Sequence, residues 1–132
     1  MRFAVEMCDL QLRADGHFVL EQPLTSRAWA LEPVMKLAAM EDVIATEFHQ
    51  CMYGLTSPTD DGKELPAKKP TRFMTNSSYI DSALSRRCSG RQGHCSRRGG
   101  GAHALCNGET AKAAAIYPFA LCRAILTGFR DQ

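Results

Sequence analysis

Apolar positions in the first half of the chain alternate between helical and strand-like spacing. Phe3 and Met7 begin a recurrence every three to four residues, which predicts an opening helix that ends at 15–16. The apolar run 18–21 predicts a buried strand, and the β-branched run 43–48 predicts a second one. The chain therefore starts as a mixture of helix and strand.

A second helix is expected between these two strands, because Pro33 suits a first helical position and an apolar face follows it. A strand, a helix and a strand in succession form a βαβ unit, so we expect the two strands to be parallel with a right-handed crossover. The run 72–75 predicts a third strand, and Asn76 or Ser77 then caps another helix.

The rest of the chain carries more breakers. Pro, Asp and Gly are frequent in 55–69, which predicts a long loop without regular structure. The segment 88–108 is rich in glycine and has no periodicity. The stretches 109–116 and 119–126 predict two helices, with Gly128 as the stop signal of the second.

The chain has 132 residues, which suits a single domain. Within residues 1–132 we distinguish an α/β part (1–87), a Cys/His/Arg/Gly-rich loop (88–108) and C-terminal helices (109–132). Apolar residues make up 45% and charged residues 23% of the chain, values that are ordinary for globular proteins and exclude general disorder. The formal net charge of +2 is too small to indicate a partner.

Export and membrane insertion are not indicated. No apolar run approaches the roughly 18 to 20 residues of a membrane span, and the first residues lack the basic start and apolar core of a signal peptide. We therefore expect an intracellular protein, cytoplasmic or nuclear, with no membrane partner. Its six cysteines are then thiols or metal ligands. Cys8, Cys51 and Cys122 have apolar neighbours and are expected to be buried thiols.

The loop 88–108 carries a candidate zinc site. His103 and Cys106 have the short spacing of one metal knuckle, and a cysteine upstream could complete the site. Adjacent His94 and Cys95 cannot easily both reach one ion. We therefore predict a structural zinc ion held by Cys88, Cys95, His103 and Cys106. The alternative is a flexible loop with reduced thiols.

The same region is locally basic. No acid lies between Asp81 and Glu109. Five arginines gather in this interval: Arg86, Arg87, Arg91, Arg97 and Arg98. Because arginines without competing acids suit a phosphate backbone, DNA or RNA is an expected partner. No aromatic residue separates Tyr79 from Tyr117, so base stacking is not indicated, and a solvated surface loop is the alternative.

Several motifs follow one another in a recognisable order. They are Phe-Val-Leu-Glu-Gln-Pro at 18–23, Ser-Arg-Ala-Trp at 26–29, Gln-Cys-Met-Tyr-Gly at 50–54, Lys-Pro-Thr-Arg-Phe-Met-Thr-Asn at 69–76, and 115–125. Together they are similar to a methyltransferase-like segment of copia-type retroelement polyproteins. Their order also resembles the C-terminal part of cytosine-5 DNA methyltransferases. The resemblance implies an α/β fold, a partial Rossmann-like domain with a three-stranded sheet and flanking helices.

In those methyltransferases a strand-end glutamate hydrogen-bonds the flipped cytosine and spaced arginines support the site. The resemblance therefore implies that Glu21 and Arg72 are the vestigial catalytic positions. The chain departs from the family pattern, because Gln22 and Pro23 follow the acid in place of Asn-Val and only one of the paired arginines is present.

Two further parts of the family pattern are missing ahead of the first strand. Residues 1–17 contain neither the Pro-Cys nucleophile turn nor the glycine-rich cofactor loop. We therefore expect no S-adenosylmethionine site and no autonomous activity. A half-sheet exposes a strand edge, so the missing N-terminal half of the domain or a second copy of the chain is an expected partner. The remaining alternative is a structural or interaction domain that neither transfers methyl groups nor binds nucleic acid.

Overall fold

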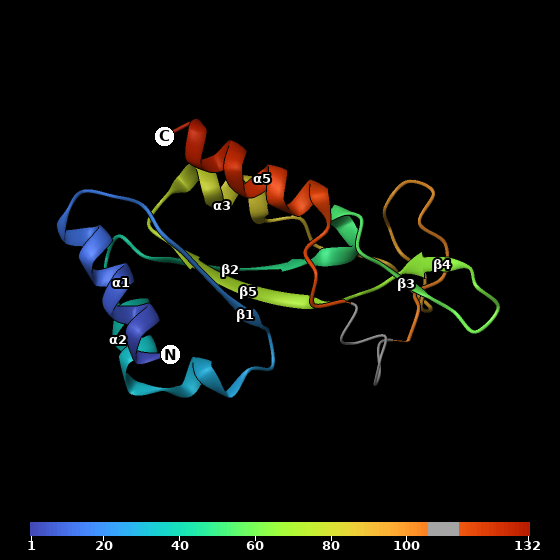
Figure 1. Ribbon diagram of the computed structural model, residues 1–132, viewed down its shortest axis with the longest axis horizontal. Coiled ribbons are helices and arrows are strands. Elements are labelled where there is room, and N and C mark those ends of the chain that lie inside the picture. The colour runs from blue at the N-terminus through green and yellow to red at the C-terminus, as the bar shows by residue number, and fades with distance from the viewer. Residues whose placement is uncertain (106–113) are drawn as a thin grey trace.

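A small sheet with helices on both faces forms the main body of the protein (Figure 1). The computed structural model describes residues 1–105 and 114–132. The helices are α1 (Arg2–Arg13), α2 (Glu32–Ala38), α3 (Ser78–Leu84) and α5 (Phe119–Arg130), with short 3-10 helices η1 (Arg27–Ala30) and η2 (Gln50–Tyr53). The strands are β1 (Val19–Pro23), β2 (Ile44–His49), β3 (Thr56–Pro58), β4 (Glu64–Pro66) and β5 (Pro70–Thr75). Within the described ranges, no helix combines the length and apolar character that a membrane span requires.

The main sheet has the order β1-β5-β2, and β5 is antiparallel to both neighbours. Phe73 on β5 lies opposite Glu21 on one side and Thr46 on the other. The expected α/β class and three-stranded sheet are therefore confirmed. The expected parallel direction of β1 and β2 is confirmed, but these strands are not hydrogen-bonded to each other, because β5 lies between them and pairs with both.

One face of this sheet packs against α3 and α5. Phe48 and Phe73 are fully buried there, with ring centroids 5.8 Å apart. They form one apolar core with Ile80, Leu84 and Leu121. Of the two predicted caps, Asn76 and Ser77, it is Ser77 that caps α3: its Oγ accepts a hydrogen bond from the N–H of Ile80 at 3.1 Å.

The other face packs against α1 and α2. Leu20 and Met74 are paired across β1 and β5. They point into a second apolar core with Cys8, Val34 and Leu37. Because successive side chains on a strand point to opposite faces, the two cores are separated by the thickness of the sheet.

Two predictions on local structure need correction. The stretch 55–69 is not an irregular loop, because β3 and β4 form a hairpin in which Thr59 N–H donates to Lys63 O at 2.8 Å. The proline and glycine residues make its strand ends and turn, with Gly62 at φ 77°. The helix predicted at 109–116 falls mostly outside the described residues, and 114–116 form a turn.

Gly128 is not a stop signal either, because α5 continues through it to Arg130. It lies instead where α5 crosses α3. A Cβ atom at this position would approach Ile80 Cα to 2.8 Å, which is closer than real Cβ contacts. The glycine therefore permits the two helices to touch.

We expect Gly128→Val to lower the free energy of unfolding by about 1–3 kcal/mol, because the added atoms force α5 away from the backbone of α3. Urea denaturation followed by circular dichroism measures the loss. Ala120→Val, at an exposed position of the same helix, is the matched control and should cost less than about 1 kcal/mol. Equal losses in the two variants would contradict close packing at Gly128.

Candidate metal centre

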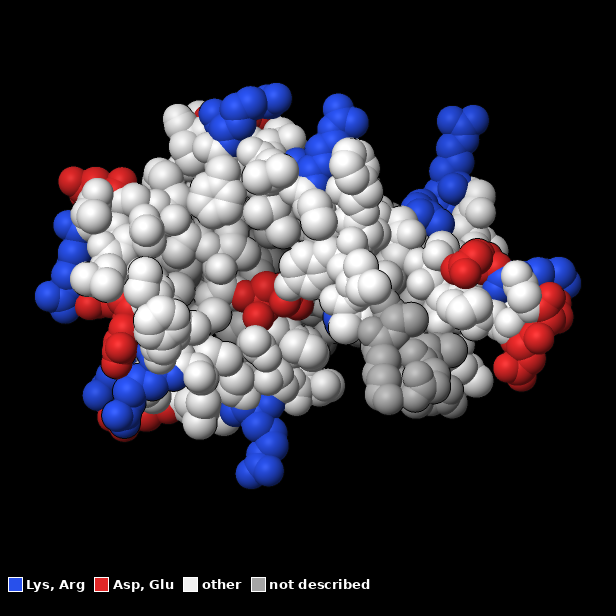
Figure 2. All heavy atoms as spheres, viewed as in Figure 1, with Lys and Arg blue, Asp and Glu red and all other residues white. Residues whose placement is uncertain are grey.

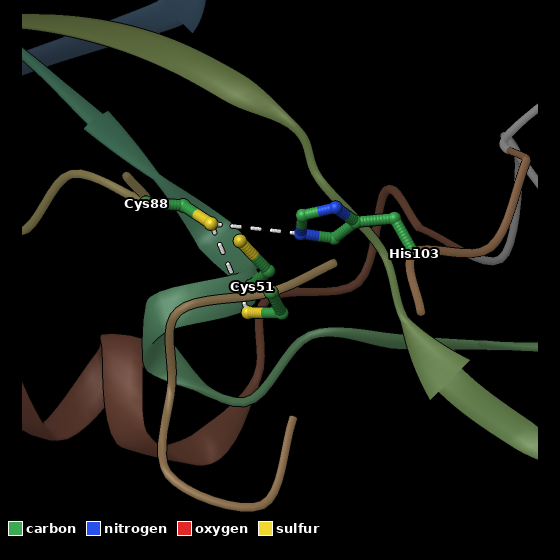
Figure 3. A group of neighbouring side chains, drawn as sticks. Cys51, Cys88 and His103 are labelled. Atoms are coloured by element: carbon green, nitrogen blue, oxygen red, sulfur yellow. Dashed lines mark hydrogen bonds between the residues drawn. The ribbon is translucent and has the colours of Figure 1, made fainter. Parts of the chain in front are cut away.

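Four potential metal ligands meet beyond the end of β2. The ligand atoms of Cys51, Cys88, Cys95 and His103 all lie within 4.8 Å of one another. Figure 3 shows Cys51, Cys88 and His103 pointing toward one another from different segments. The three cysteines are buried and the histidine is half-buried. This cluster could hold a metal such as zinc.

Cys51 enters the cluster from η2, which directly follows β2. The backbone of Gln50 is fixed to the neighbouring chain by a hydrogen bond from its N–H to Lys69 O at 3.1 Å. Its side-chain amide donates to Thr71 Oγ1 at 3.1 Å in the buried interior. Gly54 ends η2 in the left-handed conformation at φ 95°. The rigid sheet therefore sets the position of Cys51, which is 0% exposed.

Cys88 is held against the end of the same strand. Its N–H donates to His49 Nδ1 at 2.8 Å, and the N–H of His49 donates to Arg86 O at 3.0 Å. Burial and then the charge of Lys68 lower the pKa of His49. A neutral imidazole has one ring nitrogen free to accept, so this shift suits the bond from Cys88.

Cys95 and His103 lie on a short loop that folds back on itself. The N–H of Cys95 donates to Gly101 O, and the N–H of His103 donates to Gly93 O, each at 2.7 Å. The loop is attached to β4 by a bond from Ala104 N–H to Pro66 O at 2.8 Å. These bonds bring the two ligands to Cys88 without any regular helix or strand in the segment 86–105.

Two glycines leave room for the sulfur atoms. A Cβ on Gly90 would lie 1.6 Å from His94 O and 3.1 Å from Cys88 Sγ. A Cβ on Gly100 would lie 2.8 Å from Cys95 Cβ and 3.2 Å from its Sγ. The glycine content of the loop is therefore a packing requirement next to two of the ligands.

The thiols have unequal proton affinities. Burial tends to raise the pKa of Cys88, but hydrogen bonds from the Ser96 N–H and hydroxyl, the Gly90 N–H and Cys95 outweigh it and lower the pKa to about 6. The Ser96 N–H lies 3.4 Å and its Oγ 3.6 Å from the sulfur. Burial, followed by hydrogen bonding to Cys95, raises the pKa of Cys51. The cluster thus favours a thiolate at Cys88 and a thiol at Cys51.

The spacing of these atoms suits tetrahedral zinc. With Zn–S near 2.3 Å and Zn–N near 2.05 Å, a tetrahedral site separates two sulfurs by about 3.8 Å and a sulfur from a nitrogen by about 3.6 Å. Cys88 Sγ lies 3.9 Å from Cys95 Sγ and 3.6 Å from His103 Nε2. The residues therefore fit the ion that their donor atoms prefer.

The structure brings together three of the four ligands that the sequence predicts. Cys106, the fourth, lies outside the described residues. Cys51 belongs to the cluster as well, although it was expected to be a buried thiol of the apolar core. No sequence spacing signals this, because Cys51 is separated from Cys88 by a hairpin, a strand and a helix. His94 is exposed and contacts Gln92 O through Nδ1, so it stays apart from the ligand atoms.

The five arginines are placed differently from one another. Arg86 lies over the ring of Tyr53, 5.5 Å from its centroid. Arg87 donates to Glu47 O at 3.2 Å and is 3.9 Å from its carboxylate. Positive side chains are scattered around the outline of the face in Figure 2 and do not form one patch there.

The remaining three arginines belong to the loop that carries Cys95. Arg97 is half-buried, and its Nε has no hydrogen-bond partner within the described part of the chain. Arg91 and Arg98 are exposed. Both arginines belong to the segment 88–103, which also carries the potential ligands Cys88, Cys95 and His103.

Glu21 and Arg72 do not form one site. Glu21 lies opposite Phe73, so its side chain is on the α3 and α5 face, where it accepts a hydrogen bond from the Tyr117 hydroxyl. Arg72 precedes Phe73 on β5 and points to the other face. There it pairs with Glu47 at 3.3 Å and lies 5.6 Å from the ring centroid of Trp29. The sheet separates the two side chains.

Comparison with protein-family models, with curated proteins and with solved structures found no match for this chain.

The low pKa of Cys88 gives the site a testable pH dependence. Ser96→Ala removes one donor to the thiolate and should raise this pKa, so a proton then competes with zinc at neutral pH. At pH 7, a rise of one unit from the pKa of about 6 should lower zinc affinity about twofold, and a rise of two units about tenfold, because the deprotonated fraction of Cys88 falls accordingly. The difference should vanish above the ordinary thiol pKa of 9.0, because Cys88 is then deprotonated in both chains. Competition with a chromophoric chelator measures both values.

Ser89→Ala provides the matched control, since it changes an exposed serine of the same loop. Its zinc affinity should follow the wild-type curve at every pH. A loss in Ser96→Ala that stays constant from neutral to alkaline pH would contradict the thiolate argument and indicate a general disturbance of the loop.

Proposed function

We propose that Cys51, Cys88, Cys95 and His103 bind one structural zinc ion, and that the protein is a small zinc-stabilised binding module. The observation that carries this proposal is the convergence of four soft and borderline donors within 4.8 Å, from segments far apart in the sequence. In the proposal the metal fastens the irregular segment 86–105 to the end of the sheet.

The donor set supports a structural role over a catalytic one. Catalytic zinc sites keep one position open for water or substrate, whereas structural sites are closed by four protein ligands and are rich in cysteine. Three buried thiols and one imidazole fill all four positions here. Such a site has no position at which zinc could activate water, so we propose no reaction at it.

A comparison of free energies also favours metal binding. The segment 86–105 contributes little to the two apolar cores, which are built from the sheet and the helices. Structural zinc supplies apparent binding free energies of about 10–16 kcal/mol in small domains. That amount is of the same order as the whole stability of a domain, and so suffices to order a segment without a core of its own.

The direct test is zinc content after mutation of each thiol. We expect the purified chain to carry about one zinc ion and Cys51→Ser to carry well under one, because a hydroxyl replaces a buried ligand. Cys122→Ser is the matched control, since Cys122 is half-buried outside the cluster and should leave the zinc content unchanged. Elemental analysis and native mass spectrometry provide the measurement.

Cys106→Ser separates the two possible ligand sets. Retention of zinc in Cys106→Ser together with loss in Cys51→Ser supports the set proposed here. The reverse result would favour the set predicted from the sequence, and a metal-free wild-type chain would remove the proposal altogether.

As a second candidate function, we infer that the zinc-bound loop binds the phosphate backbone of a nucleic acid. The observation that favours it is the exposure of Arg91 and Arg98 on the loop, in an interval without acidic residues from 82 to 108. Guanidinium groups are suited to phosphate oxygens, and such contacts do not depend on base sequence. DNA and RNA are both compatible with this chemistry.

For this function, joint replacement of Arg91 and Arg98 by glutamine should weaken binding to a labelled oligonucleotide. It should also reduce the slope of log affinity against log salt concentration by about two, since each lost phosphate contact removes roughly one counterion. Removal of zinc by a chelator should weaken binding as well. Fluorescence anisotropy at several salt concentrations measures these effects.

Arg13→Gln combined with Arg130→Gln is the matched control, because these arginines are exposed and paired with Asp9 on α1 and with Asp131 directly after α5. An equal loss of affinity in the control would show that net charge alone governs binding. The second candidate function would then be abandoned.

We also keep as a proposal the origin of the chain in a methyltransferase-like segment of a retroelement polyprotein, with a partial Rossmann-like fold. The order of strand, helix, strand and returning strand supports it, as does the outer edge of β1, which pairs with no other strand in the described ranges. The separation of Glu21 and Arg72 by the sheet gives no support to a base-binding site. The origin therefore adds no activity to the proposed binding module.

A further inference from the structure

A hollow of about 430 Å³ lies between β1 and α5, away from the metal ligands. Its lining is Val19, Leu20, Glu21, Tyr117, Ile125 and Phe129. The hollow thus combines apolar walls with a single carboxylate.

The carboxylate of Glu21 is only half satisfied. Its Oε2 accepts a hydrogen bond from the Tyr117 hydroxyl, whereas Oε1 is buried and has no partner among the described residues. Burial, followed by the hydrogen bond to Glu21, raises the pKa of Tyr117, so the phenol keeps its proton and brings no charge. The Tyr117 hydroxyl therefore donates a hydrogen bond to Glu21 but does not balance its charge.

The contrast with Glu47 shows what is missing. Glu47 lies on β2 at the other edge of the sheet, with Arg72 at 3.3 Å and Arg87 at 3.9 Å from its carboxylate oxygens. Among the residues that the structure describes, no lysine or arginine lines the hollow at Glu21. A buried carboxylate oxygen without a cation or donor is costly, and Glu21 Oε1 has neither within the described part of the chain.

We propose that this hollow is a binding site for a small organic molecule with a primary ammonium group and an apolar body. The ammonium donates to the carboxylate of Glu21, whose side chain lines the hollow, and supplies a positive charge there. The apolar body lies against Ile125 and Phe129, of which Phe129 is 39% exposed and offers surface to cover. The site is separate from the zinc centre and from the loop arginines.

Two features favour this ligand class. The volume of the hollow falls in the range of about 300–1,000 Å³ that small-molecule sites occupy, which suits one compact molecule. An anionic ligand would be repelled by Glu21, and a neutral apolar one would leave Oε1 without a partner. A protonated amine satisfies both the charge and the acceptor.

The test compares three probes of equal chain length, hexylammonium, hexanol and hexanoate, added to the full purified chain. Nuclear magnetic resonance follows the signals of Ile125 and Phe129. We expect saturable binding of hexylammonium, at least about tenfold tighter than hexanol, because both can donate a hydrogen bond to Glu21 but only the ammonium adds a positive charge. Hexanoate should not bind. Equal affinities of the amine and the alcohol would overturn the proposal.

Glu21→Gln tests the carboxylate itself and should weaken hexylammonium binding about tenfold or more while hexanol binding changes much less, because glutamine keeps an acceptor but loses the charge. Glutamine keeps an oxygen that can accept from Tyr117, so the fold is expected to persist, and circular dichroism checks it. The matched control is Glu64→Gln on the exposed hairpin, which should bind like the wild type. Unchanged amine affinity in folded Glu21→Gln would end the proposal.

Discussion

The insertion of β5 between β1 and β2 is the constraint on which the rest of the structure depends. Because β5 pairs with both neighbours, its alternating side chains decide which residues meet on each face. Phe73 faces α3 and α5, whereas Arg72 and Met74 face α1 and α2. The same alternation assigns Glu21 and Arg72 to opposite faces, so two residues that a family resemblance links end in different environments.

The sheet also fixes the position of the ligand cluster. Cys51 follows β2 within two residues of its end, and Cys88 is attached to His49 on the same strand. Two ligands are therefore set by the most rigid part of the molecule, and the loop need only deliver Cys95 and His103. A metal can then join rigid and irregular parts of the chain, which is how closed zinc sites stabilise small domains.

Local patterns predicted those features that depend on neighbouring residues. The apolar runs gave the three strands of the sheet, and Ser77 marked the start of α3, because strand burial and capping are local effects. Pairing is not local, so the position of β5 between the other strands could not be obtained from periodicity. Cys51 was missed for a similar reason: it has apolar neighbours in sequence, and only the folded chain brings it to Cys88.

The glycines of the loop 88–108 make it costly in conformational entropy to order, and this cost bears on the proposed metal site. Glycine loses more conformational freedom on folding than any other residue, so ordering this loop is costly. The structure nevertheless needs them: Gly90 and Gly100 make room beside two sulfurs, and Gly93, Gly99 and Gly101 adopt positive φ angles. A loop that must contain so many glycines and contributes little to an apolar core requires another source of free energy. In our proposal, coordination of a metal by the buried cysteines and His103 is that source.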